Sequence, residues 1–133
     1  MTDGTARSQR ILVVDDEPAL LDAIKIAFER AGHEVVACRS FEDARARVLS
    51  ERFDAIVTDV RLGAFNGLQL GVIARDKDPS LGIIVFSGYD DPVLRAQALD
   101  LNAIYLVKPV TGERLIEELG KIADARDGKS EEL

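Results

Sequence analysis

The chain has 133 residues, of which 47% are hydrophobic and 31% charged, a composition typical of one globular domain with a single core. Its formal net charge of −7 disfavours binding to nucleic acid or to an anionic membrane surface. No apolar run reaches the ~20 residues of a membrane-spanning helix, and Met1–Arg10 lacks the apolar stretch of a signal peptide. Cys38 is the only cysteine, which excludes an internal disulfide framework and a thiolate metal cluster. We therefore expect Cys38 to be a small core residue, and the protein to work in a reducing cytoplasm.

Strand-like and helix-like segments alternate along the chain. After a leader at Met1–Gln9 that we predict to be flexible, five short apolar runs are each followed by a helical pattern. The predicted strands are Arg10–Val14, His33–Cys38, Ala55–Asp59, Gly82–Ser87 and Ala103–Val107. The predicted helices cover residues 18–31, 41–49, 68–77, 91–100 and about 111–126, before a polar, acidic tail at Asp127–Leu133. This order predicts one α/β domain over residues 10–126, doubly wound, with a parallel sheet covered on both faces.

Local signals mark the ends of these helices. Pro18 suits the first turn of a helix, and Gly32 is expected to end it. Ser40 and Asp43 have the spacing of a capping box, and Thr111 is expected to cap the last helix. Between the third strand and third helix we expect a loop at Val60–Gly67.

The apolar residues of the helices predict which faces are buried. Their spacing places Val72 of the third helix toward the core, with Val93 and Leu99 of the fourth partly buried. His33 is expected to be a surface or edge histidine, away from any reactive centre. Glu118 is expected on a solvated helix face.

Polar side chains follow the strands at their carboxyl ends. The first strand delivers Asp15 and Asp16, the third ends in Asp59, the fourth ends in Ser87, and Lys108 follows the fifth. Because the carboxyl ends of parallel strands share one edge of a sheet, where ligands bind in open α/β sheets, we expect these side chains to converge.

The chemistry of this group points to phosphoryl transfer. Three carboxylates at one edge repel each other unless a cation joins them, and oxygen ligands suit Mg²⁺. A lysine and a hydroxyl can neutralise and orient a phosphoryl group, and an aspartate that attacks phosphorus forms an aspartyl phosphate. We therefore interpret Asp59 as the reactive residue. Structural alternatives stay open: Asp59 capping a turn, Asp15 and Asp16 capping a helix, Ser87 as a strand-end hydroxyl, and Lys108 as a solvated lysine.

Four stretches carry a resemblance to a known family. They are Ile11-Leu-Val-Val-Asp-Asp-Glu-Pro18, Ile56-Val-Thr-Asp59 with Gly67 eight residues later, Ser87-Gly-Tyr89, and Tyr105-Leu-Val-Lys-Pro109. Together they resemble the receiver domains of two-component response regulators, over about residues 10–126. The resemblance implies a flavodoxin-like fold with a five-stranded parallel sheet of strand order 2-1-3-4-5.

The resemblance also implies roles for the strand-end residues. Asp59 would accept a phosphoryl group from a histidine kinase or a histidine phosphotransfer protein, and Lys108 would bind that group. Asp16, Asp59 and the backbone carbonyl of Arg61 would ligate Mg²⁺, with Asp15 acting largely through a bound water.

Two further residues would make the domain a switch. Ser87 would follow the phosphoryl group on phosphorylation, and Tyr105 would turn inward into the vacated space. This movement would repack the surface of the fourth helix, fifth strand and fifth helix, which a downstream protein, or a second copy in a homodimer, would recognise.

The chain departs from the family pattern at several positions. Leu62-Gly63 replaces the usual Met-Pro, which should loosen the loop, and Asn102-Ala103 replaces Gly-Ala in a segment that looks one residue short. Arg61 and Tyr89 occupy positions that flank the phosphoryl group in the family. One hypothesis is that they shield the acyl phosphate from water; the alternative is that both are ordinary solvent-facing side chains.

Three functions compete at this point. A phosphorylatable switch would catalyse only its own phosphoryl transfer and dephosphorylation and would not be an enzyme otherwise. A Mg²⁺-dependent aspartyl phosphatase of the haloacid-dehalogenase type would need Asp-x-Asp after the first strand, whereas Asp15 and Asp16 are adjacent. A pseudo-receiver scaffold would lack Asp16, Asp59 or Lys108, yet all are present.

Overall fold

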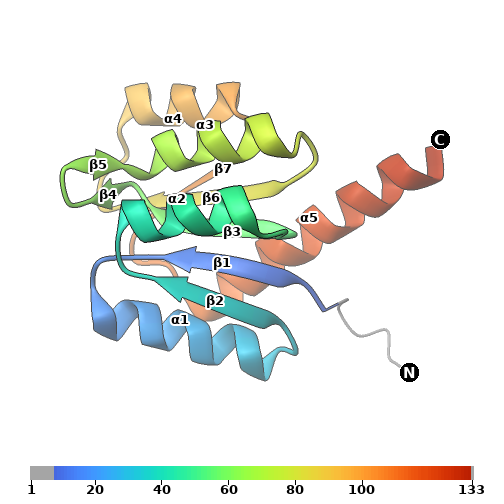
Figure 1. Cartoon of the computed structure of the whole chain (residues 1–133), viewed down its shortest axis with the longest axis horizontal. Coiled ribbons are helices and arrows are strands. Elements are labelled where there is room, and N and C mark those ends of the chain that lie inside the picture. The colour runs from blue at the N-terminus through green and yellow to red at the C-terminus, as the bar shows by residue number, and fades with distance from the viewer. Residues whose placement is uncertain (1–7, 133) are drawn as a thin grey trace.

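The core of the protein is a parallel sheet, seen in the computed structural model, which describes residues 8–132, with side chains through Asp127 (Figure 1). Its strands are β1 (Arg10–Val14), β2 (Glu34–Cys38), β3 (Ala55–Asp59), β6 (Gly82–Ser87) and β7 (Ile104–Val107). They form a five-stranded sheet in the order β2-β1-β3-β6-β7, and every neighbouring pair is parallel. Counting the strands of this sheet in chain order gives 2-1-3-4-5, which confirms the predicted topology.

Helices cover both faces of the sheet (Figure 1). They are α1 (Pro18–Arg30), α2 (Phe41–Ser50), α3 (Gly67–Lys77), α4 (Pro92–Asp100) and α5 (Gly112–Glu132). Because side chains alternate along a strand, Ile11 and Val13 of β1 pack with α1 and α5, whereas Leu12 and Val14 pack with α2 and α3. The helix α4 joins the second face through Ala98, which packs with β6.

The predicted helix ends are confirmed by their hydrogen bonds and backbone angles. Gly32 follows α1 with φ +95°, a conformation that favours glycine. The Asp43 N–H donates to Oγ of Ser40 (3.2 Å), and the Arg114 N–H donates to Oγ1 of Thr111 (3.0 Å). Both hydroxyls satisfy backbone donors that have no partner within the helix.

The predicted inner faces of α3 and α4 were partly wrong. Val72 is 56% exposed, Val93 is 65% exposed and Leu99 is 76% exposed. In α3 the buried face carries Leu70, Gly71 and Ala74, because the missing side chain of Gly71 lets the helix approach Leu101. Hydrophobicity alone favoured Val72, whereas close packing placed the small residues Gly71 and Ala74 beside Leu70 on the buried face.

The predicted loop at Val60–Gly67 contains a hairpin. Strands β4 (Arg61–Leu62) and β5 (Phe65–Asn66) pair antiparallel, and Gly63 between them has φ +61°. The Phe65 ring stacks on Phe41 of α2, with 4.6 Å between ring centroids. These contacts hold the segment, which has no proline between Val60 and Gly67.

Several polar residues also lie differently from the prediction. His33 is buried, and its Nδ1 accepts the Gln9 N–H at 3.1 Å. Gln9, assigned to the flexible leader, is itself buried and donates its side-chain N–H to Leu119 O at 3.0 Å; residues 1–7 lie outside the described part. Glu118 is buried between Arg114 (2.9 Å) and Lys121 (3.4 Å).

The last helix is longer than predicted. Its bounds, Gly112–Glu132, include most of the segment that the sequence assigned to a separate tail. Leu115 and Leu119 of this helix are buried against the sheet, as the spacing predicted. Among the described residues, no helix is both long and apolar enough to span a bilayer.

Candidate functional site

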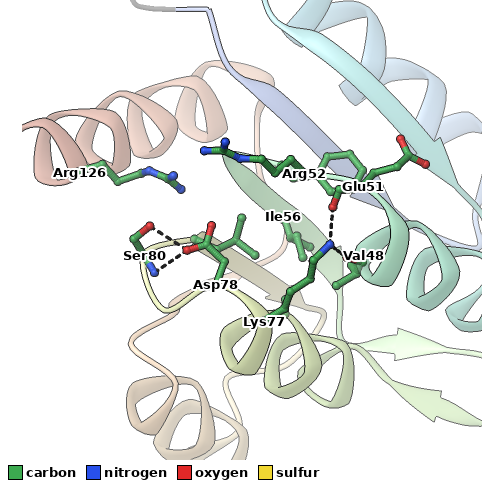
Figure 2. A pocket seen from close by; sticks show the side chains of 11 residues that line it. Val48, Glu51, Arg52, Ile56, Lys77, Asp78, Ser80 and Arg126 are labelled. Atoms are coloured by element: carbon green, nitrogen blue, oxygen red, sulfur yellow. Dashed lines mark hydrogen bonds between the residues drawn. The ribbon is translucent and has the colours of Figure 1, made fainter.

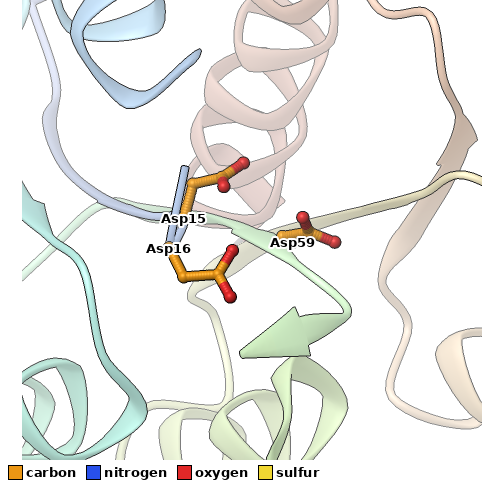
Figure 3. Close-up of side chains that lie close together, drawn as sticks. All are labelled: Asp15, Asp16 and Asp59. Atoms are coloured by element: carbon orange, nitrogen blue, oxygen red, sulfur yellow. The ribbon is translucent and has the colours of Figure 1, made fainter. Parts of the chain in front are cut away.

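Three carboxylates converge where β1 and β3 end. Asp15 and Asp16 follow β1, and Asp59 is the last residue of β3 (Figure 3). One carboxylate oxygen of each lies within 4.8 Å of the others, close enough to hold one metal ion. The pairing of β1 with β3, Val14 opposite Thr58, places these residues side by side although 43 to 44 positions separate them in the chain. The predicted convergence is therefore a property of the sheet register.

Asp15 is the most enclosed member of this cluster. Its side chain is fully buried, the Glu17 N–H donates to Oδ1 at 2.8 Å, and Oδ2 has no hydrogen-bond partner among the described residues. Burial raises the pKa of Asp15 to about 6, and the charges of Asp59 and Asp16 act in the same direction, against the Glu17 N–H and Lys108. An orphaned, buried carboxylate oxygen beside two more carboxylates fits a bound cation, which would supply the missing partner.

Asp59 is bonded on both carboxylate oxygens. Lys108 Nζ donates to Oδ2 at 3.0 Å, and the Arg61 N–H donates to Oδ1 at 3.1 Å. Lys108 reaches this position because its backbone N–H donates to Ser87 O at 2.7 Å. This bond continues the β6–β7 pairing beyond the end of β7. The Arg61 contact closes a turn, as the turn-capping alternative for Asp59 predicted, and Asp59 also belongs to the carboxylate cluster; its role as the reactive residue stays a prediction.

Gly67 packs directly against the backbone of Asp59. The Gly67 N–H donates to Val60 O at 2.7 Å and returns the hairpin onto β3. A Cβ at Gly67 would lie 2.1 Å from Asp59 O, a distance that no side chain tolerates. The side chain of Asn66 then caps α3, accepting the Leu68 N–H at 2.7 Å.

Ser87 and Tyr105 lie beside this centre and are joined through one loop. Ser87 is buried at the end of β6, next to β3, and its Oγ accepts the Tyr89 N–H at 3.2 Å. Tyr105 is 9% exposed, and its hydroxyl donates to Tyr89 O at 2.7 Å. Tyr105 therefore already faces inward in this structure. The sequence analysis expected it to turn inward only on phosphorylation.

Two exposed cations cover aromatic rings near the site. The Arg61 guanidinium lies 5.3 Å from the centre of the Tyr89 ring, and the Arg95 guanidinium lies 4.8 Å from that of Tyr105. Sequence reasoning identified Arg61 and Tyr89 but could not show that they touch. It also missed Arg95 and the Glu17 N–H, because backbone donors and surface cations leave no distinctive sequence signal.

An apolar cavity of about 440 Å³ adjoins Lys108 on the α1 and α5 side of the sheet. Its walls are Leu20, Ile24, Phe86, Pro109, Val110 and Leu115. The spacing of apolar residues in α1 and α5 gave no indication of this opening, because a cavity depends on how separate elements pack.

Comparison with known proteins agrees with this geometry. The model of the response regulator receiver domain family matches residues 11–120, and the chain therefore belongs to that family. It is 30% identical over 125 residues to the response regulator protein PilR of Pseudomonas aeruginosa, an alignment that covers 93% of this chain and 28% of PilR. It is also 30% identical over 116 residues to the alginate biosynthesis transcriptional regulatory protein AlgB of the same species, covering 86% of this chain and 26% of AlgB. The chain thus spans about a quarter of the length of these curated relatives.

Solved structures show the same fold. A CheY-like receiver domain protein from Methanospirillum hungatei superposes with a TM-score of 0.87 at 28% identity, covering 92% of this chain and 99% of that one. A response regulator from Burkholderia pseudomallei, solved with a phosphorylated aspartic acid, a calcium ion and citrate, gives 0.79 at 27% identity, covering 94% of this chain and 75% of that one.

Proposed function

We propose that this receiver domain is a phosphorylatable switch in which Asp59 accepts a phosphoryl group from a phosphohistidine. The observation that carries the proposal is the meeting of Asp59 with Lys108 and with the carboxylates of Asp15 and Asp16 at one sheet edge. The donor is a histidine kinase or a histidine phosphotransfer protein of a two-component system, and the cytoplasm is the compartment. Beyond its own phosphorylation and dephosphorylation, the domain is not an enzyme.

The residues support a direct transfer to the carboxylate. An oxygen of Asp59 attacks phosphorus, a P–O bond forms, and the P–N bond breaks with its electron pair returning to the donor imidazole. Lys108 loses its pairing with the unmodified carboxylate and binds a phosphoryl oxygen, offsetting the charge that develops there. Ser87 Oγ, at the neighbouring strand end, donates a hydrogen bond to another phosphoryl oxygen.

The donor set suits magnesium. Asp15, Asp16, Asp59 and the backbone carbonyl of Arg61 would hold the ion, in a cluster of oxygen ligands that offers no His or Cys among the described residues. When bound, Mg²⁺ neutralises phosphoryl oxygens and makes the crowded carboxylates tolerate one another. The related Burkholderia protein, solved with a phosphorylated aspartic acid and a calcium ion, is consistent with a divalent cation at such a site.

The apolar cavity beside Lys108 supports a protein as donor. A docking helix can place an apolar side chain against Leu20, Ile24 and Pro109, which holds its histidine near Asp59. The output surface would be formed by α4, β7 and α5, where Tyr105 and Ser87 act on the shared loop at Tyr89. A downstream protein, or a second copy in a homodimer, would recognise that surface.

Incubation of the full chain with acetyl phosphate and Mg²⁺ tests the proposal. We expect one acid-labile phosphoryl group per chain by intact mass, absent in Asp59→Asn and present in Asp76→Asn, an exposed carboxylate on α3. Turnover of phosphomonoesters would instead indicate the phosphatase, and no phosphorylation of the folded chain would indicate a scaffold; either result would overturn the proposal.

A further inference from the structure

A second cavity, of about 280 Å³, opens at the opposite edge of the sheet, where β3 and β6 begin (Figure 2). Its floor is apolar and buried, formed by Phe53, Ile56, Ala74 and Leu81. The ends of α2 and α3 form its walls, and Arg126 reaches it from α5. This volume is just below the ~300 Å³ at which the range of small-molecule sites begins, so the cavity suits only a small ligand.

Two guanidinium groups face this cavity from opposite sides. The ends of Arg52 and Arg126 point toward each other above the carboxylate of Asp78 (Figure 2). Burial alone would raise the pKa of Asp78, but hydrogen bonds from Ser80 and the charges of Arg126 and Arg52 hold it below its ordinary value. Oδ1 of Asp78 accepts both the N–H (3.0 Å) and the hydroxyl (2.9 Å) of Ser80. Two like charges therefore converge on one ionised carboxylate that already has other partners.

The remaining charged groups of the cavity are bonded elsewhere. Lys77 Nζ donates to Val48 O and to Glu51 O (2.7 Å), at the end of α2. The Glu51 carboxylate pairs with Arg10 and Arg47, both at 2.6 Å. Lys77 is therefore bonded to carbonyl oxygens and not to a carboxylate, so the positive charges of Arg52, Lys77 and Arg126 outnumber the charge of Asp78, in a chain whose formal net charge is −7.

The donors of the guanidinium pair are also largely available. Toward the described residues, Arg126 uses one N–H, at Nη1, to bond Asp54 O at 2.9 Å. The side chain of Arg52 is exposed and makes no hydrogen bond or ion pair with any residue that the structure describes. Guanidinium groups bind carboxylates through two parallel N–H···O bonds, so the pair can enclose one such group.

We propose that this cavity binds a small monocarboxylate with an apolar body, at a site separate from Asp59. The carboxylate lies between Arg52 and Arg126, where it offsets the excess of positive charge, and the apolar body lies on Phe53, Ile56 and Leu81. Burial of the apolar body adds to the binding free energy.

Titration of the ¹⁵N-labelled full chain with benzoate tests this site. We expect saturable NMR shifts at the backbone amides of Asp78, Ser80 and Leu81 and at the side chain of Arg52. Acetate, which lacks the apolar body, and benzamide, which lacks the charge, are expected to bind at least about tenfold more weakly.

Variants localise the binding. Arg52→Gln, which breaks no hydrogen bond or ion pair among the described residues, is expected to weaken benzoate at least about tenfold, whereas Arg45→Gln, exposed on α2 and outside the cavity, leaves it unchanged. The proposal is overturned by absence of saturable shifts up to about 10 mM benzoate, where even millimolar affinity is visible. Shifts confined to Asp16, Asp59 and Lys108, or an unchanged affinity in Arg52→Gln, would overturn it as well.

Discussion

At the scale of single residues, Asp15 shows how burial without a cation disfavours the ionised form of a carboxylate in the cluster. Its raised pKa, about 6, means that the folded chain favours the protonated carboxyl, in contrast to the unfolded chain, whose ordinary value lies near 3.8. The contribution of this group to stability is therefore greatest below pH 3.8 and is lost as the pH rises through 6. A bound divalent cation reverses that loss by favouring the ionised form.

The Asp15→Asn substitution should therefore stabilise the metal-free protein at pH 7.5, by on the order of 1–3 kcal/mol, because it removes a buried charge. The same variant should lose most of the stabilisation that Mg²⁺ gives the parent. Denaturant unfolding with and without Mg²⁺ measures both effects. Asp76→Asn, an exposed site on α3, is the control, and a destabilised metal-free Asp15→Asn would contradict this explanation.

The Arg61 and Tyr89 pair leads to a second prediction at this scale. Because the Arg61 backbone bonds Asp59 and its guanidinium lies over the Tyr89 ring, the pair can limit the access of water to an acyl phosphate. Arg61→Ala combined with Tyr89→Ala should shorten the lifetime of the phosphorylated chain several-fold, measured as phosphate release after removal of acetyl phosphate. A lifetime equal to that of the parent would indicate that both are ordinary solvent-facing side chains; Arg45→Ala, on α2, is the control.

At the scale of elements, the β4–β5 hairpin positions the reactive strand end. Leu62 of β4 is buried, Phe65 of β5 stacks on Phe41, and Gly67 lies against the Asp59 backbone. The expected loosening from the missing proline is therefore offset by packing. The hairpin is too short to show a strand period, which is why the sequence predicted a loop.

Gly67→Ala should displace Asp59, because the added Cβ would meet Asp59 O at 2.1 Å and the opposing atom belongs to the backbone. We expect destabilisation of about 1–3 kcal/mol and a lower rate of phosphorylation by acetyl phosphate. The matched control is Gly120→Ala in α5, where a Cβ would meet nothing within 4 Å and where alanine favours a helix. Equal behaviour of the two variants would show that Gly67 does not hold the strand end.

At the scale of the whole molecule, the opposite edge of the sheet joins the first described residues to α5. Gln9 bonds both His33 and Leu119, and the His33 ring packs edge-on against Phe28 at 6.3 Å. Burial lowers the pKa of His33 below 6.5, so the folded chain favours the neutral imidazole. The stability that His33 contributes is present above pH 6.5 and is lost as the pH falls from 6.5 through the lower pKa that His33 has in the folded state.

An NMR titration of His33, the only histidine, should accordingly give a pKa below 6.5 in the folded protein. His33→Gln should reduce the loss of stability between pH 6.5 and 5, measured by denaturant unfolding with excess Mg²⁺ so that Asp15 stays ionised. A pKa at or above 6.5 would contradict the burial of a neutral ring.

The sequence predicted most of the fold and the members of the candidate site. Each strand of the sheet is a continuous apolar run, and Asp15, Asp16, Asp59, Ser87 and Lys108 stand where those runs end. The structure brings these groups to one edge; their roles as metal ligands, phosphoacceptor and switch stay predictions. The buried faces of α3 and α4 were misjudged because spacing cannot tell Val72 from Gly71 until a neighbouring side chain is known.

Sequence alone determined the order of strands and helices and the charges at the strand ends, because both follow from local apolar runs and turn residues. Tertiary structure decided the contacts between distant segments: the bond of Lys108 to Asp59, the orphaned oxygen of Asp15, the inward Tyr105, and the convergence of Arg52 with Arg126. The residues in these contacts lie far apart in the sequence. Their distances are therefore set only by the register of the strands and the packing of the helices on the sheet.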